Sequence, residues 1–297
     1  MSESVLLKKP MPSNAFSTIV LAGIASNEQH PSLSLLLRRH QPVANTPFPS
    51  HMPPIVDIVP RPSHLAPPGN LRLSLSLGKV LGSGAVSRVY EATVVPSGSS
   101  SRLSDKKLPP LCVKVSRRGM ASALLPEAQN YAEMATLQGH VIPRCYGLYS
   151  ATIRDGVRFR LWEGQDEDGE LRSDSGPLYN LPENEGVLAP NAVTILVMER
   201  LGEAVPRGEL NTLAELPEIQ AMYTDISTMG VVHGHVVRSN IVRALDEPAL
   251  PVLTSPNWTK PYRYRLIDFH QSFKVNIEPR RLAAIEHVGL ERLLNDA

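Results

Sequence analysis

Proline is spread unevenly along this 297-residue chain, and its distribution limits where a folded domain can begin. Twelve of the 27 prolines fall within residues 1–70, where Pro53-Pro54 and Pro67-Pro68 are adjacent pairs. Because proline lacks a backbone N–H and fixes φ, neither a helix nor a strand ladder propagates through such a segment. We therefore predict that residues 1–70 form a mostly disordered leader rich in proline and serine.

One apolar stretch inside this leader, Ala15 to Ala25, follows two lysines and has the outline of a signal peptide or an organelle presequence. It is too short to span a bilayer, and Ser17 and Thr18 interrupt its apolar run. A plain soluble tail is therefore the favoured interpretation, and secretion or organelle import is not expected.

Charge and cysteine content narrow the class of protein further. Thirty Lys and Arg against 29 Asp and Glu give a net charge of +1, which offers no global attraction to nucleic acid or to an anionic membrane. Two cysteines, Cys112 and Cys145, cannot build a disulfide scaffold. This usage fits a reducing compartment, and we predict a cytoplasmic or nuclear protein without nucleic-acid or membrane partners.

The hydrophobic pattern changes at Leu71, where leucines begin to alternate with Arg and Ser as in a strand with one buried face. The pattern predicts a helix over Ala121–Gln138, and Asp155-Gly156 predicts a hairpin turn. Strands are predicted over Leu71–Leu77, Val86–Val94, Leu111–Val115, Tyr146–Ile153 and Val157–Trp162.

The second half of the chain follows an acidic stretch over residues 163–190, which we interpret as a solvated insertion rather than a docking site. The apolar run Ala192–Met198 predicts a buried strand, and helices are predicted from Pro217 to Gly230 and over Pro279–Leu294. Short strands are expected at Val231–His233, Ile241–Arg243 and Arg263–Ile267, and the last helix is expected to bury Leu282, Ile285, Val288 and Leu293.

Several residues that could take part in binding or catalysis occur in a fixed order along these elements. Gly82 and Gly84 lie in the turn between the first two strands, where the absence of a side chain lets backbone N–H groups approach phosphate. Lys114 lies inside an apolar strand, where a buried ammonium needs a carboxylate or a phosphate as partner. The following helix offers Glu127 and Glu133 as that partner.

Two further motifs come later in the chain. A loop over residues 233–240 begins His233-Gly234 and ends at Asn240, and a strand ends at Asp268-Phe269. Asn240 and Asp268 both offer the oxygen atoms that Mg²⁺ prefers as ligands.

In this order the motifs resemble the protein-kinase-like superfamily over roughly Leu71–Phe269. The resemblance implies an α+β, bilobal fold. A β-rich N-lobe with one helix, together with the hinge, would span residues 71–201, and a short, mostly helical C-lobe would span residues 202–297. It also implies ATP and Mg²⁺ as ligands.

The site residues follow from that resemblance. Lys114 would hold the α- and β-phosphates and be oriented by Glu127, which we favour over Glu133, while Asn240 and Asp268 would hold Mg²⁺. The other positions implied to contact the nucleotide are Gly82, Gly84, Val89, Met198, Glu199 and Leu201. His235, Asp268 and Lys114 would be the catalytic residues.

The chain departs from the family pattern at the base position. His235 stands where the family has an aspartate, and His270 replaces the glycine after Asp-Phe. A positioned base contributes about 10²–10⁴-fold to such a reaction. We therefore expect Mg-dependent transfer of the ATP γ-phosphoryl group to a hydroxyl acceptor, with protein Ser or Thr favoured, at a rate impaired by His235.

Two alternatives to this function stay open. One is a catalytically inactive pseudokinase scaffold, and the other is a small-molecule kinase of the aminoglycoside or choline type, which the His233-Gly234 start of the loop favours. Only 29 residues (297 − 268) follow Asp268, so a conventional peptide platform is not expected there. A transition-metal site at His233, His235, His270 and Asp268, and a Cys112–Cys145 disulfide, are both disfavoured.

Overall fold

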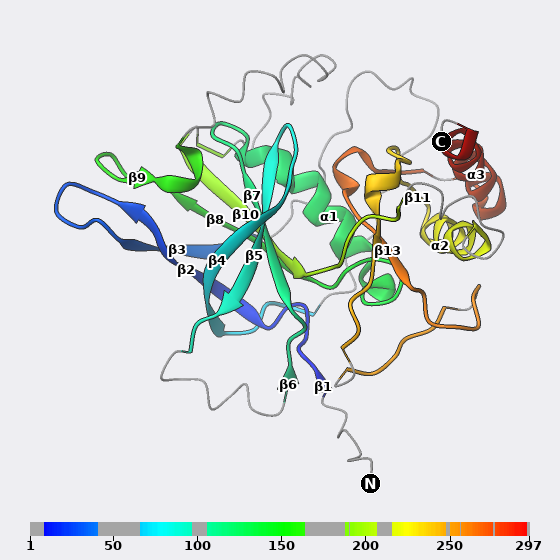
Figure 1. Ribbon diagram of the computed structural model, residues 1–297, viewed down its shortest axis with the longest axis horizontal. Helices are drawn as coiled ribbons and strands as arrows, with labels where there is room; N and C mark the ends of the chain where they lie inside the picture. The colour runs from blue at the N-terminus through cyan, green and yellow to red at the C-terminus, as the bar shows by residue number, and fades with distance from the viewer. Residues whose placement is uncertain are drawn as a thin grey trace, which may run out of the picture.

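Seven strands in the described part of the chain form a closed β-barrel (Figure 1). The computed structural model describes residues 9–40, 66–96, 106–163, 188–189, 191–206, 216–247, 250–255, 257–275 and 277–295. Around the barrel the strands are β2 (Phe16–Ser26), β3 (Leu33–His40), β8 (Cys145–Thr152), β10 (Ala192–Glu199), β7 (Leu111–Ser116), β5 (Ser87–Val94) and β4 (Leu71–Ser83). Pairing of β4 with β2, and of β2 with β3, closes the ring.

The barrel interior is filled by alternate side chains of its strands. Val113 and Val115 of β7 point inward, as do Val193, Ile195 and Val197 of β10. These residues belong to an apolar cluster with Phe16, Ile19, Leu21, Leu37, Leu73, Leu75, Tyr90, Tyr146 and Tyr149. Such alternation is what closure of a sheet requires, because each strand sends every second side chain inward.

The predicted disordered leader is wrong for residues 16–26 and 33–40, which form strands β2 and β3 of the barrel. Residues 1–8 and 41–65 lie outside the described residues. Arg39 joins β3 to its neighbours, because its guanidinium donates to the carbonyls of Phe16 (3.0 Å) and Tyr146 (2.9 Å). The N-terminal segment is thus a structural part of the barrel.

Three α-helices lie outside the barrel in the described part of the chain: α1 (Leu125–Glu133), α2 (Leu216–Thr228) and α3 (Pro279–Asn295). Small two-stranded sheets pair β1 (Lys9–Pro10) with β6 (Lys106–Lys107), β11 (Val231–Val232) with β14 (Phe273–Lys274), and β12 (Ile241–Arg243) with β13 (Tyr264–Leu266). Single 3₁₀ turns lie at Ala121–Leu124, Ala135–Leu137, Arg160–Trp162, Arg238–Asn240 and Phe269–Gln271. None of the α-helices is long and apolar enough to cross a membrane.

This architecture contradicts the expected bilobal α+β fold with a mostly helical second half. The described chain is rich in strands, its sheet is a closed barrel, and the second half contributes strands β11 to β14 beside α2 and α3. The expected hairpin at Asp155-Gly156 is also wrong, because β9 (Arg158–Phe159) pairs with β2 and not with β8. The acidic stretch falls almost entirely on residues outside the described ranges.

A second apolar core, which we call the outer core, lies between the outer face of the barrel and the helices. It contains Cys112, Leu196 and Met198 from the barrel, Leu124, Ala128 and Tyr131 from the α1 region, Ile219, Met222 and Tyr223 from α2, Leu266 and Phe269 near β13, and Leu290 from α3. Strands β7 and β10 are therefore buried on both faces.

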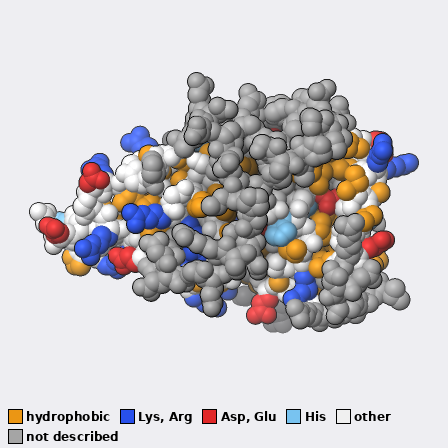
Figure 2. All heavy atoms as spheres, turned by 90° about the horizontal axis from the view of Figure 1, so that it is seen from above, with side chains coloured by type: hydrophobic (Ala, Val, Ile, Leu, Met, Phe, Trp, Pro, Cys, Tyr) orange, Lys and Arg blue, Asp and Glu red, His pale blue; other side chains and the backbone are white. Residues whose placement is uncertain are grey.

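The predicted inward side of helix α3 is confirmed for Leu282 and Leu293 and wrong for Ile285 and Val288. Leu282, Glu286 and Leu290 face inward, whereas Ile285 is 53% exposed and Val288 is 48% exposed. Hydrophobic side chains accordingly gather on the surface toward the end of the molecule that carries α2 and α3 (Figure 2).

Candidate functional site

Side chains from β7, from α1 and from the turn after β13 meet at the ammonium group of Lys114. Val113 and Val115 fill the barrel, so Lys114 points to the outer face of β7. Its Nζ lies 2.7 Å from Glu127 Oε2 on α1 and 2.6 Å from Asp268 Oδ1 after β13. The side chains of Lys114 and Glu127 are 8% and 1% exposed, whereas that of Asp268 is 25% exposed and opens toward solvent.

The charges in this cluster stabilise one another. Burial alone would lower the pKa of Lys114, but Glu127 and Asp268 outweigh burial and raise it. Burial favours a higher pKa for Asp268, but a hydrogen bond from His270 and the charge of Lys114 hold it well below its usual range. Burial raises the pKa of Glu127, although Lys114 opposes this. Lys114 is therefore a fixed cation and Asp268 a fixed anion at neutral pH.

The backbone at Asp268 is strained, and its surroundings hold that strain. Asp268 has φ 69°, a left-handed conformation that a residue with a Cβ rarely adopts. The next residue, Phe269, is buried and packs edge-on against Tyr131, with ring centroids 5.4 Å apart. The Asn130 amide donates to the Phe269 carbonyl at 2.9 Å and to the Ser272 carbonyl at 3.1 Å. Helix α1 therefore fixes both Glu127 and the turn that carries Asp268.

His233 has a structural place in the loop before β12. Its ring is fully buried, contacts the Ile267 carbonyl through Nε2 at 2.9 Å, and packs against Phe269. Burial lowers its pKa to about 4, so it is neutral at pH 7. Gly234 follows with φ 73°, and a Cβ there would lie 2.6 Å from the Gln271 carbonyl oxygen, so only glycine fits.

His235 and Asn240 lie together at the other end of this loop. The Asn240 amide nitrogen donates to the His235 carbonyl at 3.1 Å and lies 3.3 Å from His235 Nδ1. Because an amide nitrogen only donates, this contact favours the tautomer in which Nδ1 accepts and Nε2 carries the proton. Burial lowers the pKa of His235, so its ring is neutral near pH 7.

Two residues in the described chain suit Mg²⁺ as the resemblance implies. The Ile267 N–H donates to the Asn240 carbonyl at 3.0 Å, which places Asn240 beside the strand that ends at Asp268. Asp268 Oδ1 is occupied by Lys114 and by His270 at 3.0 Å, which leaves Oδ2 and the Asn240 side-chain oxygen as ligands. One or two protein oxygens with phosphate and water are a usual set for Mg²⁺. Within the described residues, no three His, Cys, Asp or Glu side chains converge as a metal site, so the histidine cluster gains no support.

The glycine turn lies at the tip of β4 and β5, above the end of β7. Gly82 is opposite Val89, and Val89 is in turn opposite Lys114 across β5 and β7. A Cβ at Gly82 would have no heavy atom within 4 Å, and one at Gly84 would contact only the Ser87 carbonyl at 3.8 Å. Open space therefore surrounds the turn, although its conformation does not itself demand glycine.

The expected nucleobase residues are used mainly within the protein. Met198 is buried between Cys112 and Cys145, its partners on the two neighbouring strands, so the two thiols are separated by a strand and both are free. The Glu199 carboxylate pairs with Arg144, and its carbonyl accepts from Cys112 Sγ at 3.6 Å. Leu201 is partly buried.

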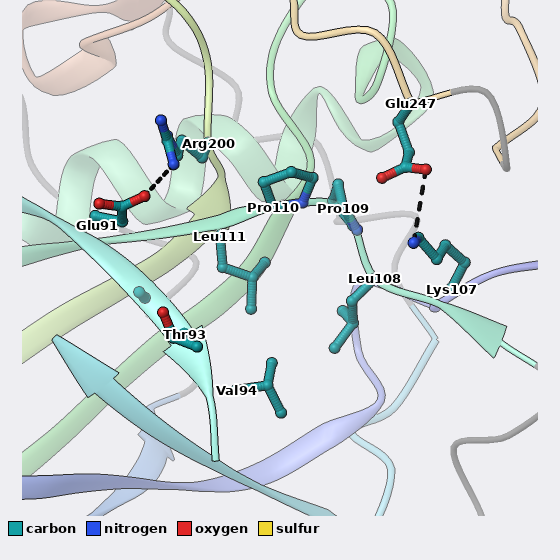
Figure 3. Close-up of a pocket in the computed structure, with 11 residues that line it drawn as sticks. Glu91, Thr93, Val94, Lys107, Leu108, Pro109, Pro110, Leu111, Arg200 and Glu247 are labelled. Carbon is teal, nitrogen blue, oxygen red and sulfur yellow. Dashed lines mark hydrogen bonds and ion pairs between the residues drawn. The ribbon is translucent and has the colours of Figure 1, made fainter. Parts of the chain in front are cut away.

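A separate cavity of about 350 Å³ lies where β5 ends and β7 begins, at the end of the strand pair away from the glycine turn (Figure 3). Its walls carry two ion pairs, Glu91 with Arg200 and Lys107 with Glu247, and apolar groups such as Leu111 lie between them. Each cation is already paired with a carboxylate. The two ion pairs of the cavity therefore cancel in charge.

The structure brings Lys114, Glu127, Asp268, His235 and Asn240 into one region. Glu133 pairs instead with Lys274 of β14, at 2.5 Å. Sequence reasoning missed the contact of His270 with Asp268, because a histidine after Asp-Phe was noted only as a replacement for glycine. It also missed Asn130 and Glu286, which no pattern distinguishes from ordinary helix positions.

Comparison of the chain with protein-family models and with curated proteins finds no match. The function of the site therefore has to be argued from its own geometry.

Proposed function

We propose that the cluster at Lys114 binds the phosphate chain of ATP together with Mg²⁺. The observation that carries the proposal is the position of Lys114 Nζ, 2.7 Å from a fully buried carboxylate and 2.6 Å from a partly exposed one. A lysine held by two carboxylates is fully charged and fixed in direction, as a phosphate-binding lysine must be.

The net charge of the cluster supports a role for the metal. Lys114 contributes +1 and the two carboxylates contribute −2, so the protein groups alone would repel a triphosphate. Bound Mg²⁺ would supply the missing positive charge and bridge the phosphate oxygens. Asp268 and Asn240 supply protein oxygens for it, and Glu127 keeps Lys114 in place.

Transfer of the γ-phosphoryl group to a hydroxyl acceptor, with protein Ser or Thr favoured, is the activity that we propose for the bound nucleotide. Phosphoryl transfer depends mainly on positioning and charge neutralisation, so it proceeds slowly without a strong base. The neutral His235 is the candidate proton acceptor, and it functions only in the tautomer whose Nε2 lacks a proton.

A specific observation favours a second candidate, a nucleotide-binding scaffold without transfer. The contact of the Asn240 amide with His235 Nδ1 places the ring proton on Nε2, where it blocks proton acceptance. Nucleotide binding itself does not need this base.

Calorimetric titration with Mg·ATP tests the binding proposal. We expect binding by the wild type, loss of binding in Lys114→Met, and retention in Lys274→Met. The latter is a matched control, because Lys274 is 7% exposed and also pairs with a helix glutamate. Absence of heat in the wild type at millimolar nucleotide would overturn the proposal, as would equal loss of binding in both variants when both remain folded by circular dichroism.

A radiolabelled transfer assay separates the two candidates. Turnover by the wild type that disappears in Asp268→Asn supports the phosphotransferase. Activity that arises only in His235→Asp, with a gain of about 10²-fold or more, supports the scaffold. Labelling of amino alcohols but of no protein would instead indicate a small-molecule acceptor.

For the cellular location we propose the cytoplasm or the nucleus. Cys112 and Cys145 are both free and buried, and burial raises the pKa of each thiol to about 12, which keeps them unreactive.

A further inference from the structure

Arg117 ties the turn between β4 and β5 to the end of β7. Arg117, which follows directly after β7, donates from Nε to the Gly84 carbonyl at 2.8 Å and from Nη2 to the Ser83 hydroxyl at 3.0 Å. Its backbone N–H also donates to the Val86 carbonyl at 2.9 Å. Three contacts from one residue therefore tie the turn to the strand of Lys114.

One of these contacts determines where the backbone N–H of Ala85 points. A trans peptide directs its C=O and N–H to opposite sides. Because Arg117 binds the Gly84 carbonyl, the N–H of Ala85 points away from Arg117. The Gly84 N–H is used by the Ser87 carbonyl at 2.9 Å, whereas those of Ala85 and Val86 donate to no group in the described part of the chain.

Two consecutive backbone N–H donors that no described protein group uses are available to an anion at this turn. Ser83, Gly84 and Ala85 are exposed, and the open space at Gly82 leaves room for a ligand beside them. The turn also lies over the strand pair in which Val89 is opposite Lys114. A phosphate chain that begins at Lys114 therefore has donors available at this turn.

We infer that Arg117 is a positioning residue for the phosphate chain: it holds the turn in the shape that presents the Ala85 and Val86 N–H groups to the terminal phosphates of the nucleotide. This inference rests on the proposed function. Arg117 lies outside the predicted motifs, and in this inference it controls the affinity for the phosphates. Nothing in it requires Arg117 to touch the nucleotide.

Affinities for ATP, ADP and adenosine, measured by calorimetry on the full chain, test the inference. In Arg117→Ala we expect ATP to bind about tenfold more weakly, since the loss of a charged hydrogen-bond donor has an effect of this order. ADP should lose less and adenosine nothing. Arg118→Ala, which removes the same charge from the next residue, should leave all three affinities within about twofold, because exposed charges act weakly.

Two further variants separate positioning from general stability. Arg117→Lys keeps the charge and one donor and should recover part of the ATP affinity. Ser83→Ala should weaken ATP binding less than Arg117→Ala and should add little to it in the double variant, because both remove the same contact. Thermal unfolding of each variant, with an unchanged midpoint, excludes global destabilisation.

The possible outcomes are distinct. Unchanged ATP affinity in Arg117→Ala, or equal weakening of ATP and adenosine, would overturn this inference and leave the proposed function intact. A wild type that binds neither ATP nor inorganic tripolyphosphate would overturn both. Protection of the Ala85 and Val86 amides from hydrogen exchange by tripolyphosphate in the wild type, lost in Arg117→Ala, would support the inference directly.

Discussion

The barrel interior and the outer face of the same strands bury different kinds of groups. On β7 the neighbours Val113 and Lys114 show the contrast, since the first points into an apolar interior and the second into a cluster of charges. The interior of the barrel stabilises the fold by burial of apolar surface, whereas each buried ion pair on the outer face gains little net stability over an apolar replacement. One face of the sheet therefore maintains the fold, and the other holds the groups suited to chemistry.

The largest effect on the free energy of unfolding should come from the barrel interior at β2 and β3, which we call the N-terminal hairpin. Leu37 on β3 is fully buried and Leu36 is 45% exposed on the opposite face. Leu37→Ala should lower the free energy of unfolding by about 4 kcal/mol, as large-to-small substitutions in cores do, and Leu36→Ala by about 0.5 kcal/mol or less. Urea denaturation measures both, and equal small effects would mean that the hairpin is not part of the cooperative unit.

Removal of one charged side chain from the cluster at Lys114 should have the next largest effect on the free energy of unfolding. Lys114→Met leaves the buried Glu127 and the partly exposed Asp268 without their shared cation. We expect a loss of about 3 kcal/mol in the free energy of unfolding, since an uncompensated buried charge costs about 3–5 kcal/mol. The double variant Lys114→Met with Glu127→Gln should recover part of this loss in the same urea experiment. No recovery would show that the pair is not coupled.

The free energy of unfolding should depend on pH because of Glu286 in α3. Its carboxylate accepts a hydrogen bond from the His233 N–H, and burial raises its pKa from 4.5 to about 7. A carboxyl group whose pKa is raised by folding stabilises the fold at low pH and loses that contribution as the pH rises through the folded value. The free energy of unfolding should therefore fall between about pH 4.5 and pH 7, by up to about 3 kcal/mol.

Glu286→Gln should remove this pH dependence, because glutamine cannot ionise but still accepts from His233. Wild type and variant should be nearly equal at pH 5, and the variant should be more stable at pH 8. Parallel stability curves across this range would show that Glu286 ionises as in the unfolded chain.

The smallest effect should occur on the exposed side of α3. Ile285→Lys should change the free energy of unfolding by less than about 0.5 kcal/mol, as surface substitutions do, because the side chain is 53% exposed. Leu290→Ala, on the buried side of the same helix, provides the contrast in one denaturation series. A large loss of stability in Ile285→Lys would instead support the prediction from the sequence that the side of α3 carrying Ile285 is buried.

Sequence reasoning succeeded where the information was local and failed where it depended on pairing. The positions of β5, β7 and β12 were predicted from the hydrophobic pattern. The contacts of Lys114 with Glu127 and Asp268 agree with the order of the motifs. The strands β2 and β3 were missed because prolines surround them. Their partners β4, β8 and β9 are distant in the sequence, so no local pattern reveals the pairing.

Helix α3 shows a second reason for failure. Its inward side reads Leu282, Glu286, Leu290, so a carboxylate lies where hydrophobicity predicts an apolar residue. The predicted side contained Ile285 and Val288, which are exposed. A hydrogen bond to His233 explains the burial of Glu286, and that bond exists only after the loop before β12 has been placed.

Closure of the barrel has a consequence for how the chain is made. β3 pairs with β2 on one side and with β8 on the other, and β8 lies more than a hundred residues further along the chain. While the ribosome is still producing that stretch, the early hairpin has an open edge carrying leucine side chains, a state that invites association with other chains. The barrel therefore closes late, through a pairing between strands that are distant in the sequence. We expect slow folding and a need for chaperone protection in the living cell.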